Sequence, residues 1–186
     1  MQREDRWDQA VLGMLDDLEM QAEGLHLAER AVEVDELSVA QYAEVELVGR
    51  LHASVGRQVR VGTTDGLELH GRLTGTGADW ILLSDGRGGA SFVSLAAIGV
   101  LGGIAPGSQP VEARPLTARL SLRSALRGLA EDRRQCMVQL RGGRTVPGNL
   151  LRVGADFVEL RQGGTGESVL LPLAAVAVVQ SSAGDR

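Results

Sequence analysis

The sequence contains no lysine, few aromatic residues and a single cysteine, and each scarcity narrows what the protein can be. All 19 basic residues are arginines, which we attribute to the base composition of a GC-rich genome rather than to function. Aromatic residues make up only 3% of the chain, so its cores must consist mainly of Leu, Val, Ile and Ala. We therefore do not expect a broad aromatic platform that stacks the bases of a nucleic acid.

The scarcity of cysteine and of long apolar runs bears on the cellular compartment. Cys136 has no second cysteine with which to form an internal disulfide, and no charged segment followed by an apolar one stands at Met1. The longest apolar candidate, VLLPLAAVAVV from Val169, falls well short of the roughly 20 residues that span a bilayer. We expect a soluble, cytoplasmic protein without a membrane partner.

Acidic and basic residues are distributed unequally along the chain. Residues 1–48 contain 13 Asp or Glu and 3 Arg, whereas residues 49–186 contain 11 acidic residues and 16 Arg. Such asymmetry is typical either of an interaction tail or of a solvated helix face beside an ordinary domain. We favour a solvated helix face as the explanation of the excess of acidic residues in 1–48.

An internal duplication is the strongest pattern in the sequence. GRLTGTGADWILL (71–83) matches GNLLRVGADFVEL (148–160), and each segment leads to a second match, LAAIGV (95–100) and LAAVAV (173–178). Self-similarity at a fixed separation indicates that one supersecondary unit occurs twice. Two small domains are therefore expected rather than one larger domain.

A helical arm is predicted ahead of the duplication. Apolar residues alternate at spacings of four and three, an average of about 3.5 residues that keeps one seam facing a partner helix. Gly24 bends or divides the arm, and Ser38 with Gln41 resembles a capping box, so one long helix and a hairpin both remain open. We predict self-association through the seam, whose members are Trp7, Val11, Met14, Leu18, Leu25, Ala28, Val32, Val39 and Tyr42.

The period changes from helical to alternating after Gly56, which predicts short strands. Asp65-Gly66 is the strongest hairpin signal in the chain. Five short strands bent at glycines are typical of a small barrel. The predicted strands of the first unit are Val59–Val61, Leu67–Leu69, Asp79–Leu83, Ser91–Leu95 and Ala97–Leu101.

The second unit repeats this order after a linker rich in Gly and Pro. A short helix is expected from Leu116 to Leu129, and the turn Arg141–Gly143 is expected to be shorter than its equivalent in the first unit. The predicted strands are Cys136–Leu140, Arg144–Leu151, Asp156–Arg161, Ser168–Leu171 and Ala174–Val179. The resulting divisions are an acidic helical arm (1–55), a first barrel (56–102), a linker with the start of the short helix (103–121), a second barrel (122–180) and a disordered tail (181–186).

Both units resemble the Sm-like small β-barrel. The resemblance rests on V-x-V, a turn, G-x-L, then G-x-D before an apolar strand, and a closing AAI or AAV segment. It implies a mainly β protein, with an N-terminal helical arm followed by two five-stranded barrels whose edge strands can pair with neighbours and whose loops can bind RNA. Trp80, Ile81 and Leu82 occupy the region where the Sm family carries a base-recognising Asn, so the resemblance supports the fold better than a uridine pocket. The chain also resembles, more weakly, an uncharacterised actinobacterial family with a helical arm and paired barrels, which implies no function.

The repeated Gly-Ala-Asp-aromatic segment offers the first candidate site. Asp79 and Asp156 could contact a ligand, but we favour turn residues that bond their own backbone. Trp80 and Phe157 could stack on a base, but a large ring that begins a half-buried strand is more often part of the core.

No catalytic or metal-binding signature accompanies these segments. His26, His52 and His70 are scattered without Cys or carboxylate neighbours at ligand spacing, and Cys136 is interpreted as a core residue. The Gly-rich stretches lack the Lys of a phosphate-binding loop. We expect no enzyme activity, no metal and no cofactor.

The leading hypothesis is a non-enzymatic interaction or scaffold protein that binds itself through the arm, together with an unidentified protein. The alternative is a regulatory protein that binds RNA or DNA, since Arg clusters can contact phosphates. The candidate nucleic-acid-binding residues are Arg114, Arg119, Arg123, Arg127, Arg133, Arg134, Arg141, Arg144 and Arg152.

Overall fold

The computed structural model describes residues 42–86, 88–132 and 135–181. The chain divides into two compact units, Met1–Val45 and Glu46–Arg186. Most of the predicted arm, with the seam residues from Trp7 to Val39, lies outside the described residues, as do residues 182–186 of the predicted tail. The second unit contains both copies of the duplication and is described below.

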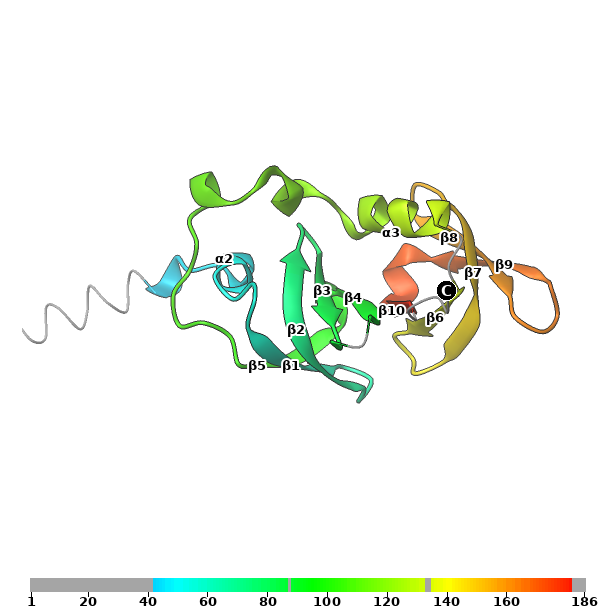
Figure 1. Ribbon diagram of the computed structural model, residues 1–186, viewed down its shortest axis with the longest axis horizontal. Coiled ribbons are helices and arrows are strands. Elements are labelled where there is room, and N and C mark those ends of the chain that lie inside the picture. Colours follow the sequence, from blue (N-terminus) through cyan, green and yellow to red (C-terminus); the bar gives the residue numbers. More distant parts are fainter. Residues whose placement is uncertain (1–41, 87, 133–134, 182–186) are drawn as a thin grey trace, which may run out of the picture. The chain divides into compact units, whose positions relative to one another are not determined.

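Ten strands in this unit form one antiparallel sheet, in the order β5-β1-β2-β3-β4-β10-β6-β7-β8-β9 (Figure 1). The strands of the first copy are β1 (Gln58–Thr63), β2 (Glu68–Thr76), β3 (Trp80–Ser84), β4 (Ala90–Ser94) and β5 (Ile98–Gly102). Those of the second copy are β6 (Gln135–Leu140), β7 (Thr145–Val153), β8 (Phe157–Gln162), β9 (Ser168–Pro172) and β10 (Val176–Ser181). Each copy therefore has the same internal strand order, as expected for a duplication.

Local sequence explains the first hairpin. Val59 and Val61 are buried in β1, whereas Gln58 and Arg60 are exposed, so the period of two separates a core face from a solvent face. The turn after Thr63 closes with Gly66 at a φ of 88°, a conformation that glycine adopts without steric cost. The predicted hairpin is confirmed.

The prediction of two separate barrels is not confirmed, because β4 of the first copy pairs with β10 of the second. Val178 pairs with Val93 and Ser181 with Ala90 across this joint. The buried clusters also exchange residues: Trp80 of the first copy belongs to the core of the second, and Val178 belongs to the core of the first. One continuous sheet results, because the main-chain donors and acceptors on the β4 edge of the first copy pair with those on the β10 edge of the second.

Two short α-helices precede the two copies. The first is α2 (Leu47–His52), followed by Gly56 at a φ of 91°. The second is α3 (Leu122–Glu131), which packs on β7 and begins where the Ser121 hydroxyl accepts the Ser124 N–H (Figure 1). The helix predicted from Leu116 therefore starts later, because this cap fixes its first turn. The linker ahead of it contains the 3-10 turns η2 (Val111–Ala113) and η3 (Leu116–Arg119).

Three smaller predictions are wrong. Ala97 and Ala174 lie in 3-10 turns, η1 (Leu95–Ala97) and η4 (Leu173–Ala175), rather than in strands. The first turns of the two copies, 64–67 and 141–144, have equal length. Ser181 is buried at the end of β10, so that strand extends into the predicted tail because β4 and β6 both pair with it. Within the described ranges, no helix is long and apolar enough to cross a membrane.

Candidate interaction sites

The first Gly-Ala-Asp turn (Gly77–Trp80) binds a main-chain segment of the linker. The Ala78 N–H donates to the Leu120 carbonyl at 3.0 Å, and the Trp80 indole Nε1 donates to the same oxygen at 2.8 Å. The Asp79 Oδ1 accepts the Leu122 N–H at 2.6 Å. Three bonds from one turn therefore fix the segment that leads into α3.

Gly77 permits this close approach. A Cβ at this position would clash with the Trp80 ring nitrogen and with the Leu120 carbonyl oxygen. The indole lies over the glycine, is 8% exposed, and packs with Leu122 and Leu126 in one buried cluster. The predicted core role of Trp80 is confirmed. Asp79 lies in a turn, but the predicted bond to its own backbone is wrong, because its carboxylate accepts from a residue 43 positions away.

The second Gly-Ala-Asp turn (Gly154–Phe157) has the same backbone hydrogen bonds. The Gly154 N–H donates to the Phe157 carbonyl at 2.8 Å, as the Gly77 N–H donates to the Trp80 carbonyl at 2.9 Å. The Asp156 carbonyl accepts the Leu173 N–H at 2.7 Å, as the Asp79 carbonyl accepts the Leu95 N–H at 2.9 Å.

Within the described part of the chain, the second turn nevertheless contacts no segment equivalent to the linker. Ala155 and Asp156 are exposed and Phe157 is only partly buried. Among the residues that the structure describes, neither the Ala155 N–H nor the Asp156 carboxylate makes a hydrogen bond. The two copies of the turn thus have one backbone geometry but differ in whether a segment is bound.

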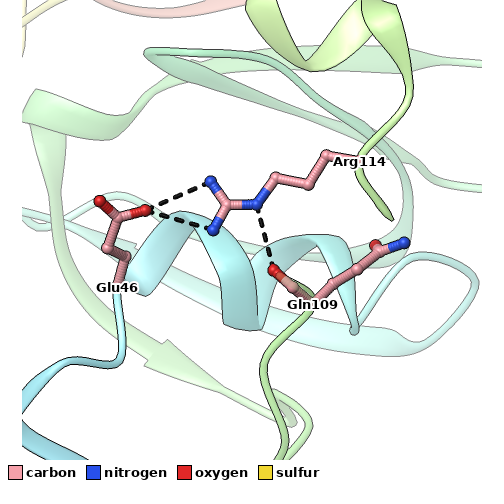
Figure 2. A network of polar contacts seen from close by, with 3 residues as sticks. All are labelled: Glu46, Gln109 and Arg114. Carbon is pink, nitrogen blue, oxygen red and sulfur yellow. Dashed lines mark hydrogen bonds and ion pairs between the residues drawn. The ribbon is translucent and has the colours of Figure 1, made fainter. Parts of the chain in front are cut away.

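A second polar cluster attaches the linker to α2. Figure 2 shows Arg114, whose Nη1 and Nη2 each lie 3.2 Å from Oε2 of Glu46 and whose Nε donates to the Gln109 carbonyl at 3.1 Å. His52 of α2 is 7% exposed and its Nε2 has no hydrogen-bond partner in the structure. Burial, with a smaller contribution from the Arg114 charge, lowers the pKa of His52. This cluster has the features of a structural contact, because its charged groups neutralise each other.

The candidate nucleic-acid-binding arginines lie on several elements. Arg114 and Arg119 belong to the linker, Arg123 and Arg127 lie four apart on α3, Arg141 and Arg144 lie in the β6–β7 turn, and Arg152 lies on β7. Arg133 and Arg134 fall outside the described residues. Arg114 pairs with Glu46, and Arg152 pairs with Glu159 at 3.0 Å. In the described part of the chain, Arg123, Arg127, Arg141 and Arg144 make no ion pair.

Tyr42 and Cys136 are two further residues that the sequence singled out. Tyr42 of the predicted self-association seam is 59% exposed. Cys136 is buried, its thiol donates to the Gly148 carbonyl at 3.3 Å, and burial raises its pKa to about 11. The thiol is therefore protonated at neutral pH and poorly suited to nucleophilic attack. Over residues 42–86, 88–132 and 135–181, no group of three His, Cys, Asp or Glu is placed to hold a metal ion.

The sequence contains the Gly-Ala-Asp turns as visible repeats, but it does not show what they bind. The signal available was the aromatic residue after each Asp, because an indole N–H that is buried usually finds an acceptor. Nothing in the sequence indicates that the acceptor is Leu120.

Comparison with known proteins assigns no family. No protein-family model matches the chain, and no curated protein is significantly similar to it.

Proposed function

We propose that this protein is a non-enzymatic interaction or scaffold protein that binds other copies of itself and displays two Sm-like units. The observation that carries the proposal is the β4–β10 joint, in which the main-chain edges of the two copies of the duplication pair with each other. The same two kinds of edge recur at β9 and β5, the ends of the sheet, where neither strand has a second partner among the described strands.

The main-chain groups of Leu170 in β9 face away from the sheet. Leu173 donates to Asp156 and Gln162 donates to Glu167, and hydrogen-bonded pairs alternate along an antiparallel ladder. The residues bonded to β8 are therefore Val169 and Leu171. The Leu170 N–H and carbonyl point outward, and its side chain is 62% exposed.

In β5 the main-chain groups that face away from the sheet are those of Leu101. Thr63 donates to Leu67, the residue before β2, so the residues of β1 that bond β5 are Arg60 and Gly62, whose partners are Gly102 and Val100. The Gly103 carbonyl already accepts from Arg57 Nε at 3.1 Å, which leaves Leu101 at the centre of the available edge.

The internal joint supports a specific pairing of these edges. Phe92 pairs with Val179 in the joint. By the alignment of LAAIGV with LAAVAV, Leu170 corresponds to Phe92 and Leu101 to Val179. Antiparallel pairing of Leu170 with Leu101 of another copy would continue the sheet head to tail, which generates rings or filaments.

Sedimentation velocity over a concentration series tests the proposal on the full chain. Leu170→Pro removes the outward N–H without removing a β8 bond, so we expect it to reduce self-association. Leu170→Ala keeps the N–H and shortens the side chain, and it is the matched control. A wild-type chain that remains monomeric at tens of micromolar would contradict the proposed self-association.

The predicted arm is a second surface for self-association in this proposal. Glu substitutions at Leu18 and Leu25 would place charges in the seam and should weaken assembly if the seam joins copies. Assembly that responds to Leu170→Pro but not to these changes assigns self-association to the sheet edge.

Nucleic-acid binding is our second candidate, because four arginines of α3 and the β6–β7 turn make no ion pair with any described residue. A titration of RNA and DNA at two salt concentrations tests it. Binding should weaken steeply with salt, and Arg141→Glu with Arg144→Glu should reduce it. Salt-independent binding, or no effect of the charge reversals, would exclude phosphate contacts by this turn.

A further inference from the structure

The two Gly-Ala-Asp turns have the same backbone hydrogen bonds, but among the described residues only the first binds a chain segment, and this difference identifies a second interaction surface. We infer that the second Gly-Ala-Asp turn (Gly154–Phe157) binds the segment ahead of α2 of another copy, centred on residues 43–45. The inference rests on the proposed function, since it requires copies to meet head to tail.

The first turn defines what the second can bind. Ala78, Asp79 and Trp80 provide one main-chain donor, one carboxylate acceptor and one indole donor to Leu120–Leu122. Ala155 and Asp156 offer the same donor and acceptor, and both are exposed. The phenyl ring of Phe157 has no N–H to replace the Trp80 indole donor, so the second turn lacks the third bond and should bind its segment less tightly than the first.

The repeat determines which segment would lie there. The segment bound by the first turn leads into the helix and first strand of the following copy of the duplication. Leu122 stands 13 residues before Gln135, the first residue of β6, and Val45 stands 13 residues before Gln58, the first residue of β1. By this count residues 43–45 correspond to Leu120–Leu122. The Val45 N–H donates to the Tyr42 carbonyl at 3.1 Å, so binding to the second turn would exchange that bond for one to the Asp156 carboxylate.

The edge pairing and the turn select the same neighbour. Pairing of Leu170 with Leu101 of a second copy would place that copy's first half after β9, as the second half follows β4 within one chain. The second Gly-Ala-Asp turn would then face the segment ahead of α2 of the incoming copy, as the first turn contacts the segment that leads into α3. An aligned edge and a bound segment together define both direction and register of assembly.

Mixed cross-linking tests the inference on full-length chains. Asp156→Cys in one chain and Val45→Cys in another should yield a covalent dimer when mixed under mild oxidation. Each variant alone should give at least about tenfold less, because a head-to-tail contact joins different surfaces. The wild-type chain, whose Cys136 is buried, is the background control.

Substitution of the carboxylate provides an independent readout. Asp156→Ala removes the acceptor and should weaken self-association by about tenfold or more, the effect of losing a charge-assisted hydrogen bond. Asp156→Asn retains an oxygen acceptor and should restore part of the affinity. Glu167→Ala, at an exposed acidic residue of the β8–β9 loop, should leave association unchanged.

Three results would overturn the inference while sparing the proposed function. They are assembly of the wild type without a mixed cross-link, cross-linking of Asp156→Cys with itself, and closure of an intramolecular disulfide in a chain that carries both Asp156→Cys and Val45→Cys. The second would indicate a two-fold contact, and the third would indicate that the chain's own segment occupies the turn. A wild type that never assembles would refute the proposed self-association itself.

Discussion

The main-chain N–H of Leu122 donates to Oδ1 of Asp79 at 2.6 Å, and this bond connects the first copy of the duplication to the helix of the second. The contact attaches the start of α3 to a turn that precedes β3. Sequence patterns assign Asp79 to a local turn, but this bond gives it a role in tertiary structure.

Replacement of Asp79 by Ala should therefore destabilise the fold. The Leu122 N–H would lose its acceptor in a partly buried site, which costs about 1–3 kcal/mol of unfolding free energy. Urea unfolding at a concentration that disfavours association measures the change. Asp156→Ala is the matched control, because that carboxylate makes no hydrogen bond to a described residue, and we expect a change within about 0.5 kcal/mol. Equal effects of the two variants would contradict the role assigned to Asp79.

A core substitution tests whether α3 is integral to the fold of the second copy. Leu126 is fully buried in the cluster that also contains Trp80 and Leu150. Leu126→Ala should reduce the free energy of unfolding by about 2–5 kcal/mol through lost burial and the cavity left behind. Leu116 is 81% exposed, so Leu116→Ala should have little effect. A small effect at Leu126 would show that α3 is only loosely attached.

The buried His52 predicts a loss of stability on mild acidification. Its folded pKa lies below the ordinary value of 6.5 because of burial and then the Arg114 charge. The unfolded chain therefore binds a proton more readily, and stability falls as the pH drops through 6.5 and on through the lower folded pKa.

Urea midpoints at pH 7.5 and 5.5 measure this dependence. His52→Leu should reduce the difference between the two midpoints, whereas His70→Gln, at an exposed position, should preserve it. An unchanged difference in His52→Leu would assign the acid sensitivity to other groups.

Cys136 predicts a loss of stability at the other end of the pH range. Burial raises its pKa from the ordinary 9.0 to about 11, so the folded chain retains the proton that the unfolded chain releases. The contribution is complete below pH 9 and is lost as the pH rises towards 11.

Thiol labelling at pH 8 provides the kinetic counterpart. The folded chain should react far more slowly than the chain in urea, because the thiolate fraction is about 100-fold lower and the group is enclosed. Because Cys136 is the single cysteine, the rate reports on one site. Equally fast labelling in both states would show that the strand carrying Cys136 opens readily.

Sequence patterns predicted the local elements of this protein well and their connections poorly. The alternation of Val59 and Val61 with polar neighbours is a local property of β1, and Asp65-Gly66 is a local turn signal. Both features can therefore be predicted from the sequence. The pairing of Phe92 with Val179 depends on two edges 87 residues apart, and no local pattern encodes it. The same holds for the candidate site, where the Asp79 carboxylate meets an N–H on a distant helix.

The sequence by itself determined that one unit of five strands occurs twice, because side-chain periodicity and turn chemistry are read within a few residues. Only the tertiary structure decided that the two copies of the duplication share one sheet and exchange core residues such as Trp80 and Val178. It also decided that the two Gly-Ala-Asp turns differ in what they bind. The physical reason is that main-chain donors and acceptors are the same at every residue, so which edges and turns they join depends on their positions in space rather than on residue type.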